Sequence, residues 1–155
     1  MIEIATAVPT DVAAILDLQK RAYQSEAQLY NDWSLPPLTQ SLESLQHEIS
    51  TITVLKAVRE GVVVGSARAA LAGETCAVGR LMVEPRLQGQ GIGSALLHAV
   101  EACFPAAGTF ELFTGSRSLD NLRLYQRHGY VESRREEVSP RLTLVFLRKQ
   151  RLSAT

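Results

Sequence analysis

Three glycines within seven residues form the stretch whose chemistry is easiest to state. Residues 88–94 read Q-G-Q-G-I-G-S; they follow an apolar run that ends at Val83 and lead into a helical pattern from Ala95 to Val100. Glycine lets a backbone approach a ligand closely because it has no Cβ. The first N–H groups of the following helix lack intrahelical partners and carry partial positive charge. This order favours a seat for a phosphate or pyrophosphate; a tight turn without a ligand is the alternative.

Two common phosphate-binding loops fit this stretch poorly. A Walker loop ends in Gly-Lys-Ser/Thr, whereas Gly93 is followed directly by Ser94. The dinucleotide fingerprint G-x-G-x-x-G stands early in a βαβ unit, whereas these glycines are spaced G-x-G-x-G and lie past the middle of the chain. The sequence therefore favours neither of these nucleotide-binding classes.

The glycine stretch instead resembles the acyl-CoA pyrophosphate loop of GNAT-type N-acetyltransferases, whose pattern is Q/R-x-x-G-x-G/A. Gln88, Gly91 and Gly93 satisfy that pattern. A second stretch, residues 118–130 (S-L-D-N-L-R-L-Y-Q-R-H-G-Y), is similar to the family's S-x-x-N-x-x-L-Y-x-x-x-G-Y/F helix and turn. The two motifs in this order are far more specific than either alone, and the resemblance is strong over residues 79–130.

The resemblance implies an acetyl-CoA-dependent N-acetyltransferase in which the cofactor lies between a splayed fourth and fifth strand, here residues 75–83 and 109–114. It implies Tyr125 as the general acid for the leaving thiolate, with core packing as the alternative. Many relatives carry Asn where this chain has Ser118, which we expect to cap the following helix. The residues implied in binding the cofactor are Leu81, Val83, Gln88, Gly89, Gln90, Gly91, Gly93, Ser94 and Asn121.

The general base is not evident in the sequence. Some family members place a Glu in the middle of the fourth strand, whereas this chain has Ala77, Val78 and Gly79 there. Glu26, on the first predicted helix, is close enough in the expected fold to reach the acceptor side. An ordinary solvated carboxylate is the alternative interpretation of Glu26.

Two arginines interrupt apolar strand segments and are candidates for the acceptor side. Arg68 and Arg80 either form structural ion pairs, with Glu26 or Glu111 as partners, or hold an anionic part of the acceptor. The break around residues 30–38 contains Trp33, which would wall the acceptor site or plug the core.

The periodicity of the chain predicts the elements that must position these residues. Helical spacing runs from Val12 to about Tyr30 after a Thr10 cap, and again after a Thr39 cap. Gly129 is expected to cap the last helix. Further helices are expected at 93–103 and 119–128, and strands at 2–8, 51–59, 62–71, 75–83, 109–114, 130–138 and 141–147.

The order β-α-α-β-β-β-α-β-α-β-β predicts an α/β (α+β) fold: a mixed sheet with helices on both faces. At 155 residues the chain suits a single domain over 1–150, with a polar tail from Arg148 and 151–155 frayed. A hairpin is predicted at Glu60-Gly61. The resemblance also allows a homodimer through the closing strands.

The composition and net charge of the chain limit the kinds of binding partner that we expect. Lysine plus arginine equals aspartate plus glutamate, which gives a net charge of +0, so neither nucleic acid nor a membrane surface is favoured. No signal peptide or membrane span is evident. Cys76 and Cys103 suit buried free thiols in a reducing cytoplasm, and no cysteine or histidine pair has metal-ligand spacing.

The sequence therefore predicts a cytoplasmic transferase that moves an acetyl group from acetyl-CoA to a primary amine, a small molecule rather than a protein. Direct transfer with no metal is expected. A non-catalytic acyl-CoA binding or sensing module of the same fold is the alternative, because no base is evident.

Overall fold

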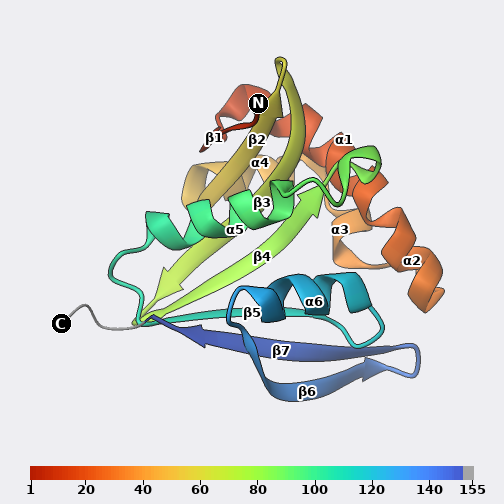
Figure 1. Cartoon of the computed structure of the whole chain (residues 1–155). Helices are drawn as coiled ribbons and strands as arrows, with labels where there is room; N and C mark the ends of the chain where they lie inside the picture. The colour runs from red at the N-terminus through yellow and green to blue at the C-terminus, as the bar shows by residue number, and fades with distance from the viewer. Residues whose placement is uncertain (152–155) are drawn as a thin grey trace.

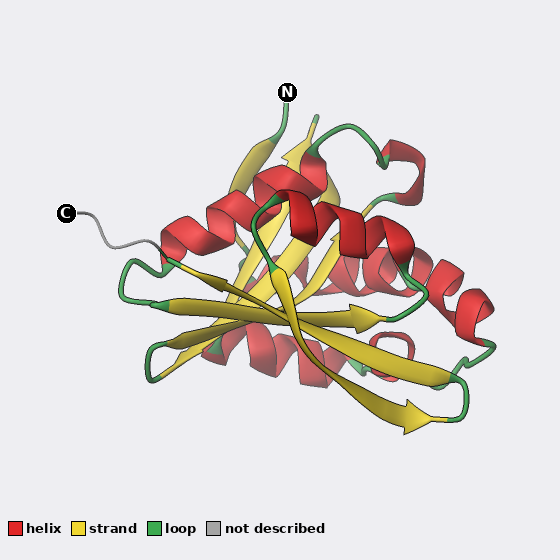
Figure 2. Ribbon diagram, turned by 60° about the horizontal axis from the view of Figure 1, so that its bottom comes forward, coloured by secondary structure: helices red, strands yellow, loops and turns green. Residues whose placement is uncertain are grey.

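The sheet of this protein has helices on both of its faces (Figures 1 and 2). The structure is a computed structural model that describes residues 1–151. The strands are β1 (Glu3–Thr6), β2 (Thr53–Arg59), β3 (Val62–Ala72), β4 (Thr75–Val83), β5 (Thr109–Gly115), β6 (Val131–Ser139) and β7 (Leu142–Gln150). The α-helices are α1 (Val12–Ala22), α2 (Gln24–Tyr30), α3 (Pro36–Thr39), α4 (Leu42–Thr51), α5 (Ile92–Cys103) and α6 (Leu119–Arg127), with short 3-10 helices η1 (Pro9–Asp11) and η2 (Pro85–Leu87).

The strand order is β1-β2-β3-β4-β5-β7-β6, and every neighbouring pair is antiparallel except β4 and β5. The predicted mixed sheet is therefore confirmed. The hairpin between β2 and β3 is also confirmed: Glu60 and Gly61 both have positive φ, 52° and 78°. A two-residue turn with two such residues matches the twist of the strands that it joins.

Two apolar layers hold the helices on the sheet. On one face, α5 buries Leu96, Leu97 and Val100 against β3 and β4. On the other face, α1 buries Ile15 and Leu18 in a second cluster that α4 completes. Burial of apolar side chains removes them from water, which is the main stabilising contribution to such a fold.

The structure corrects two features of the first predicted helix: it is not continuous, and Thr10 does not cap it. The helix stops at Tyr23, where α1 ends and α2 begins. Thr10 does not cap it, because the chain enters through η1. The Asp11 carboxylate instead accepts a hydrogen bond from the backbone N–H of Val8 (2.7 Å) and pairs with Lys56 (2.8 Å). No side chain therefore caps α1: Asp11 stands at its N-cap without a capping bond, and its carboxylate instead ties the entry of the chain to β2 through Lys56.

The cap of the next helix is also corrected. Ser41, rather than Thr39, caps α4 by accepting a hydrogen bond from the backbone N–H of Ser44 (3.1 Å). Pro36 and Pro37 break the chain as expected but also begin the one-turn helix α3. Proline fits the first helical turn, because the N–H it lacks would have no partner there.

The polar end of the chain is more ordered than predicted. β7 continues through Gln150, and Arg148 donates to the Glu111 carboxylate (2.6 Å). The Arg151 side chain donates to the carbonyl oxygens of Ala107 (3.1 Å) and Phe104 (3.0 Å). The last strand therefore runs three residues beyond its predicted end at 147, and residues 152–155 of the predicted frayed tail lie outside the described residues.

The two cysteines differ in exposure. Both are free thiols, but Cys76 is buried in β4 and Cys103 is exposed at the end of α5. The expectation of a buried thiol is confirmed for the first and wrong for the second. Over residues 1–151, no helix combines the length and the apolar composition needed to cross a membrane.

Candidate active site

The site begins where two parallel strands separate. β4 and β5 pair only from Thr75 opposite Thr109 to Ala77 opposite Glu111. Beyond that point β4 runs on to Val83 without β5 beside it, and Figure 1 shows the two strands diverging. The later part of β4 therefore has backbone groups on one side with no strand partner, and an extended ligand arm can bind them as an added half-strand.

A bulge bends β4 at the same place. Ser66 of β3 pairs with Met82, whereas Arg68 pairs with Gly79, so Ala67 faces two residues of β4. One of those two, Arg80, has a φ of 49°, in the left-handed region that a non-glycine residue adopts at a cost. The extra residue redirects β4 as it leaves β5, which opens the sheet toward α6.

The glycine turn forms one wall of this opening. Gly91 is the N-cap of α5, and Gly89 and Gly91 have φ values of 81° and 87°. A Cβ at either position would meet no atom within 4 Å, so the glycines are required by their backbone conformation and leave open space beside them. Gly93 packs closely, because a Cβ there would lie 3.3 Å from the end of the Leu124 side chain of α6, which would have to shift slightly.

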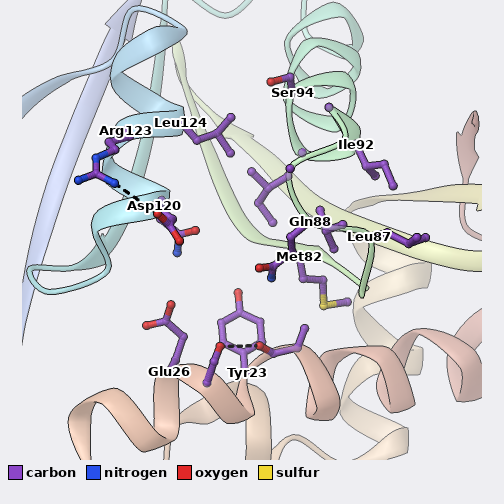
Figure 3. Close-up of a pocket in the computed structure, with 18 of the residues that line it drawn as sticks. Tyr23, Glu26, Met82, Leu87, Gln88, Ile92, Ser94, Asp120, Arg123 and Leu124 are labelled. Carbon is purple, nitrogen blue, oxygen red and sulfur yellow. Dashed lines mark hydrogen bonds and ion pairs between the residues drawn. The ribbon is translucent and has the colours of Figure 1, made fainter. Parts of the chain in front are cut away.

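A cavity of about 560 Å³ lies between these elements (Figure 3). Its walls come from the end of α1, the start of α2, the separated part of β4, the glycine turn and α6. The residues that line it are Ala22, Tyr23, Ser25, Glu26, Leu81, Met82, Val83, Leu87, Gln88, Gly89, Gly91, Ile92, Gly93, Ser94, Asp120, Asn121, Arg123, Leu124 and Arg127.

This cavity brings together most of the residues that the sequence predicted for the cofactor. Gln90 is the exception, because it lies off the cavity and accepts a hydrogen bond from Arg59 (3.3 Å). The predicted residues that line the cavity are Leu81, Val83, Gln88, Gly89, Gly91, Gly93, Ser94, Asn121 and Glu26. The open glycine turn, the N-terminus of α5 and the unpaired edge of β4 fit a pyrophosphate with an extended arm.

α6 contributes side chains that are held by hydrogen bonds. The Asn121 amide donates to the Thr114 hydroxyl (3.2 Å), which fixes its orientation on the cavity wall. Ser118 stands at the N-cap of α6, but its hydroxyl makes no capping bond. That hydroxyl donates to the Glu26 carboxylate (2.6 Å), so the expected cap is wrong and a contact between α6 and α2 replaces it.

Two tyrosines lie near the site, and only one was predicted. Tyr125 is buried in α6 and is not among the residues that line the cavity. Burial is the main cause that raises its pKa, and nearby Tyr23 and Glu26 add to it. Tyr23, which the sequence analysis missed, points into the cavity (Figure 3). Burial raises the pKa of Tyr23 to about 12, opposed by Arg80 and increased by Glu26.

The two strand arginines belong to a polar network behind the cavity wall. Arg68 pairs with Glu48 of α4, and Arg80 donates to the side-chain oxygen of Gln40 (3.0 Å). The predicted partners, Glu26 and Glu111, are therefore wrong, since neither pairs with these arginines. Neither arginine lines the cavity. Contact with an anionic acceptor stays a prediction.

The tryptophan lies apart from these residues. The Trp33 side chain is 55% exposed, so it does not plug the core, and it does not line the cavity. The sequence analysis placed the break around residues 30–38 at the acceptor site because the resemblance to the GNAT family implies that specificity lies there. In the part of the chain that the structure describes, no group of three or more His, Cys, Asp or Glu side chains could hold a metal ion.

A histidine supports the helix that carries the glycine turn. The His128 Nε2 atom and the Ser94 hydroxyl lie 2.8 Å apart, and the His98 ring stands edge-on to the His128 ring. Burial, then His98 and Lys149, lower the pKa of His128. A neutral imidazole therefore supports Ser94 on the cavity wall.

A split sheet edge beside a glycine-lined helix terminus is a geometry that suits a pyrophosphate-bearing ligand. Residues 12–130 match the sequence profile of the Acetyltransferase (GNAT) family. The chain therefore belongs to the GNAT acetyltransferase family and is by class an acyltransferase. No curated protein matches the sequence.

Solved structures share the fold at low sequence identity. The PaiA N-acetyltransferase of Thermoplasma acidophilum in complex with coenzyme A is 17% identical, with 97% of this chain and 99% of that chain covered and a TM-score of 0.82. An N-acetyltransferase of Staphylococcus aureus is 19% identical, with 97% and 98% covered and a TM-score of 0.79. A putative acetyltransferase of Salmonella typhimurium with acetyl-CoA is 23% identical, with 96% and 93% covered and a TM-score of 0.75.

Proposed function

We propose that this protein transfers the acetyl group of acetyl-CoA to a primary amine in the cytoplasm. The observation that carries the proposal is the cavity where β4 leaves β5, walled by the glycine turn at the start of α5. Two of the structural neighbours contain coenzyme A or acetyl-CoA, which supports the same ligand here. Gly89, Gly91, Gly93 and Ser94 would hold the pyrophosphate, and Leu81 and Val83 the extended arm.

A small acceptor is favoured over a lysine tail. Beside the cavity, a shallower hollow of about 390 Å³ opens between α2 and α6. Its charged lining residues are Glu26, Asp120, Arg117 and Arg123, which balance in sign. An acidic groove of the kind that would attract a basic tail is therefore not part of this surface.

The reaction needs the amine to lose protons while the thiolate leaves. Acetyl-CoA supplies the acyl group as a thioester. The amine nitrogen forms a bond to the acyl carbon, the carbon–sulfur bond breaks, and an N–H proton ends on the sulfur. We assign Tyr125 as the acid that donates a hydrogen bond to the leaving sulfur. Its raised pKa keeps the phenol protonated, and the neighbouring α6 residues Asn121 and Leu124 line the cavity.

The first test is thermal unfolding with acetyl-CoA, followed by thiol release in the presence of spermidine, tyramine or an alanine-terminated peptide. A ligand at about 100 times its Kd adds roughly 2.7 kcal/mol to the unfolding free energy. A rise in Tm with thiol release supports the proposal. A rise in Tm without thiol release from any amine would favour the sensing module. No rise in Tm would exclude both the transferase and the sensing module.

Tyr125→Phe tests the acid, with Tyr23→Phe as the matched comparison. Loss of the general acid should lower kcat by about 100-fold and leave KM for acetyl-CoA unchanged. Tyr23→Phe removes a different phenolic hydroxyl, one that does line the cavity, and should lower kcat less. If Tyr23→Phe shows the larger loss, the acid is Tyr23 and the assignment to Tyr125 is wrong.

A further inference from the structure

One carboxylate faces the cavity without a cationic partner. Glu26 lines both the cavity and the hollow between α2 and α6. Figure 3 shows it pointing into the cavity beside Tyr23. No lysine or arginine within residues 1–151 forms an ion pair with it, although Arg117 and Arg123 line the same hollow. A carboxylate in this situation is available to a cation that enters from solution.

A chain of hydrogen bonds holds that carboxylate. The backbone N–H of Arg117 donates to the Tyr30 hydroxyl (3.0 Å), and the Ser118 hydroxyl donates to Glu26 Oε2 (2.6 Å). Tyr30 and Ser118 share a further bond of 2.7 Å. Because the only proton of Ser118 goes to Glu26, the proton in that shared bond belongs to Tyr30. The chain therefore runs in one direction and ends on Glu26 Oε2.

The hydrogen bonds of this chain are buried, and they require a residue without a side chain at position 115. Tyr30 is 3% exposed and Ser118 is 5% exposed, so water does not compete for these bonds. A Cβ on Gly115 would lie 1.9 Å from the Tyr30 hydroxyl oxygen, so only glycine leaves room for the tyrosine. Two segments far apart in the sequence, α2 and residues 115–118, thus cooperate to fix one oxygen of one carboxylate. The second oxygen, Oε1, makes no described hydrogen bond.

The carboxylate also acts electrostatically on both tyrosines of the site. Glu26 contributes to the raised pKa of Tyr23 and of Tyr125. The hollow between α2 and α6 adjoins the cavity, because Ser25, Glu26, Asp120, Asn121 and Arg123 line both. An amine that enters through the hollow would meet Glu26 before it met the acyl group.

We propose that Glu26 is the catalytic base, which binds the ammonium form of the acceptor and takes one of its protons before attack. The acceptor class is then an amine that is protonated in solution, such as an alkyl amine. The ammonium proton passes to Glu26 and later to water, the freed lone pair forms the C–N bond, and the second N–H proton leaves with the thiol. Ser118, Tyr30 and Gly115 are positioning residues. This assignment rests on the proposed acetyl transfer.

Glu26→Gln tests the assignment, because glutamine keeps the shape and can still accept from Ser118. With the best amine of the three named above, kcat/KM at neutral pH should fall by about 100-fold or more, and KM for acetyl-CoA should hold. The deficit should shrink as the pH rises, since a growing share of the amine is already unprotonated. A structural role would lower Tm without this pH dependence.

Two further variants sharpen the test. Glu43→Gln makes the same change at an exposed position of α4 and should leave activity intact. Ser118→Ala keeps the Glu26 carboxylate but removes the hydrogen bond that holds it. This variant should lower kcat by about tenfold with KM for acetyl-CoA unchanged. Ser118→Ala also keeps the assignment testable if Glu26→Gln does not fold.

The possible failures are distinguishable. If the wild-type protein is active and Glu26→Gln matches the Glu43→Gln control, the assignment of the base is wrong and acetyl transfer stands. If acetyl-CoA raises the Tm of the wild type but no amine releases thiol, the proposal of acetyl transfer is wrong, and so is the assignment of Glu26 as its base.

Discussion

The two sides of the cavity are built by different means. On the cofactor side, a short continuous stretch supplies the site through its backbone: Gly89 and Gly91 take left-handed conformations, and α5 presents its free N–H groups. On the side proposed for the acceptor, the candidate site is made of side chains far apart in the sequence. Glu26 and Ser118 are 92 residues apart, and Tyr30 and Ser118 are 88 apart.

This difference explains how each side is stabilised. A backbone site needs little more than the right dihedral angles, which glycine adopts without strain. A side-chain site needs distant segments to be packed correctly against each other, because every hydrogen bond of the chain from Arg117 to Glu26 joins α2 to the residues just before α6. We therefore expect the acceptor side to be the more sensitive of the two to changes in packing.

The largest expected effect is that of Gly115→Ala. The new Cβ would lie 1.9 Å from the Tyr30 hydroxyl oxygen and 2.3 Å from the ring carbon that carries it. Tyr30 must move, which breaks its bonds to Arg117 and Ser118. Overpacking together with these losses should cost about 3 kcal/mol, a fall in Tm of roughly 6–12 °C in thermal unfolding.

Gly108→Ala is the matched control for that change. Its new Cβ would lie 3.9 Å from the nearest atoms, those of Glu74, which is ordinary contact. Neither glycine has a positive φ, so the two variants differ in packing and not in backbone strain. Equal stability of the two variants would show that Tyr30 has room to shift, and that the acceptor side is less tightly packed than the structure implies.

The same contrast governs what the sequence could predict. The strand β4, the glycine turn, α5 and α6 follow from local pattern, and their predicted bounds agree with the structure to within about a residue. Tyr23 gives no local signal, because its role depends on the break between α1 and α2. The partners of Arg68 and Arg80 were wrong for the same reason, since Glu48 and Gln40 come from α4 and the segment before it.

Ser118 illustrates the limit most clearly. Its position before α6 predicts a capping hydroxyl, and its backbone does stand at the N-cap. The side chain is instead committed to Glu26, a residue that the local sequence around α6 cannot reveal. Local propensity identifies where the helix begins, but a long-range hydrogen bond decides where the hydroxyl points.

On the cofactor side, Ser94→Glu should remove binding while keeping the fold. Ser94 is the third residue of α5, where a carboxylate interacts favourably with the helix dipole. The same carboxylate would stand where the pyrophosphate is expected, and charge repulsion should weaken acetyl-CoA binding by about 100-fold. Calorimetric titration with acetyl-CoA measures this loss.

Ser44→Glu is the control on α4. Ser44 is also the third residue of its helix, follows the Ser41 cap, and is exposed away from the cavity. The new glutamate completes a capping box, so the variant should be at least as stable as the wild type and bind acetyl-CoA normally. If both variants bind equally well, the pyrophosphate does not lie at the start of α5.

The smallest expected effect concerns His128 and acid pH. Burial, His98, Lys149 and Arg127 lower the pKa of His128, while Glu101 opposes them. The unfolded chain therefore takes up a proton at a higher pH than the folded protein does. The contribution to stability is present above the unfolded value of about 6.5 and is lost as the pH falls through the lower folded pKa.

His128→Asn should flatten that part of the stability curve. Urea unfolding between pH 7 and pH 5 should show a smaller loss of unfolding free energy in this variant than in the wild type. His47→Asn, at an exposed position of α4, is the control and should keep the wild-type curve. The rise in Tm caused by acetyl-CoA can be compared across the same pH range. If it weakens with falling pH in the wild type but not in His128→Asn, the imidazole is also linked to the cofactor side through Ser94. A flat wild-type curve would mean that folding leaves the pKa of His128 unchanged, which would contradict the lowered pKa.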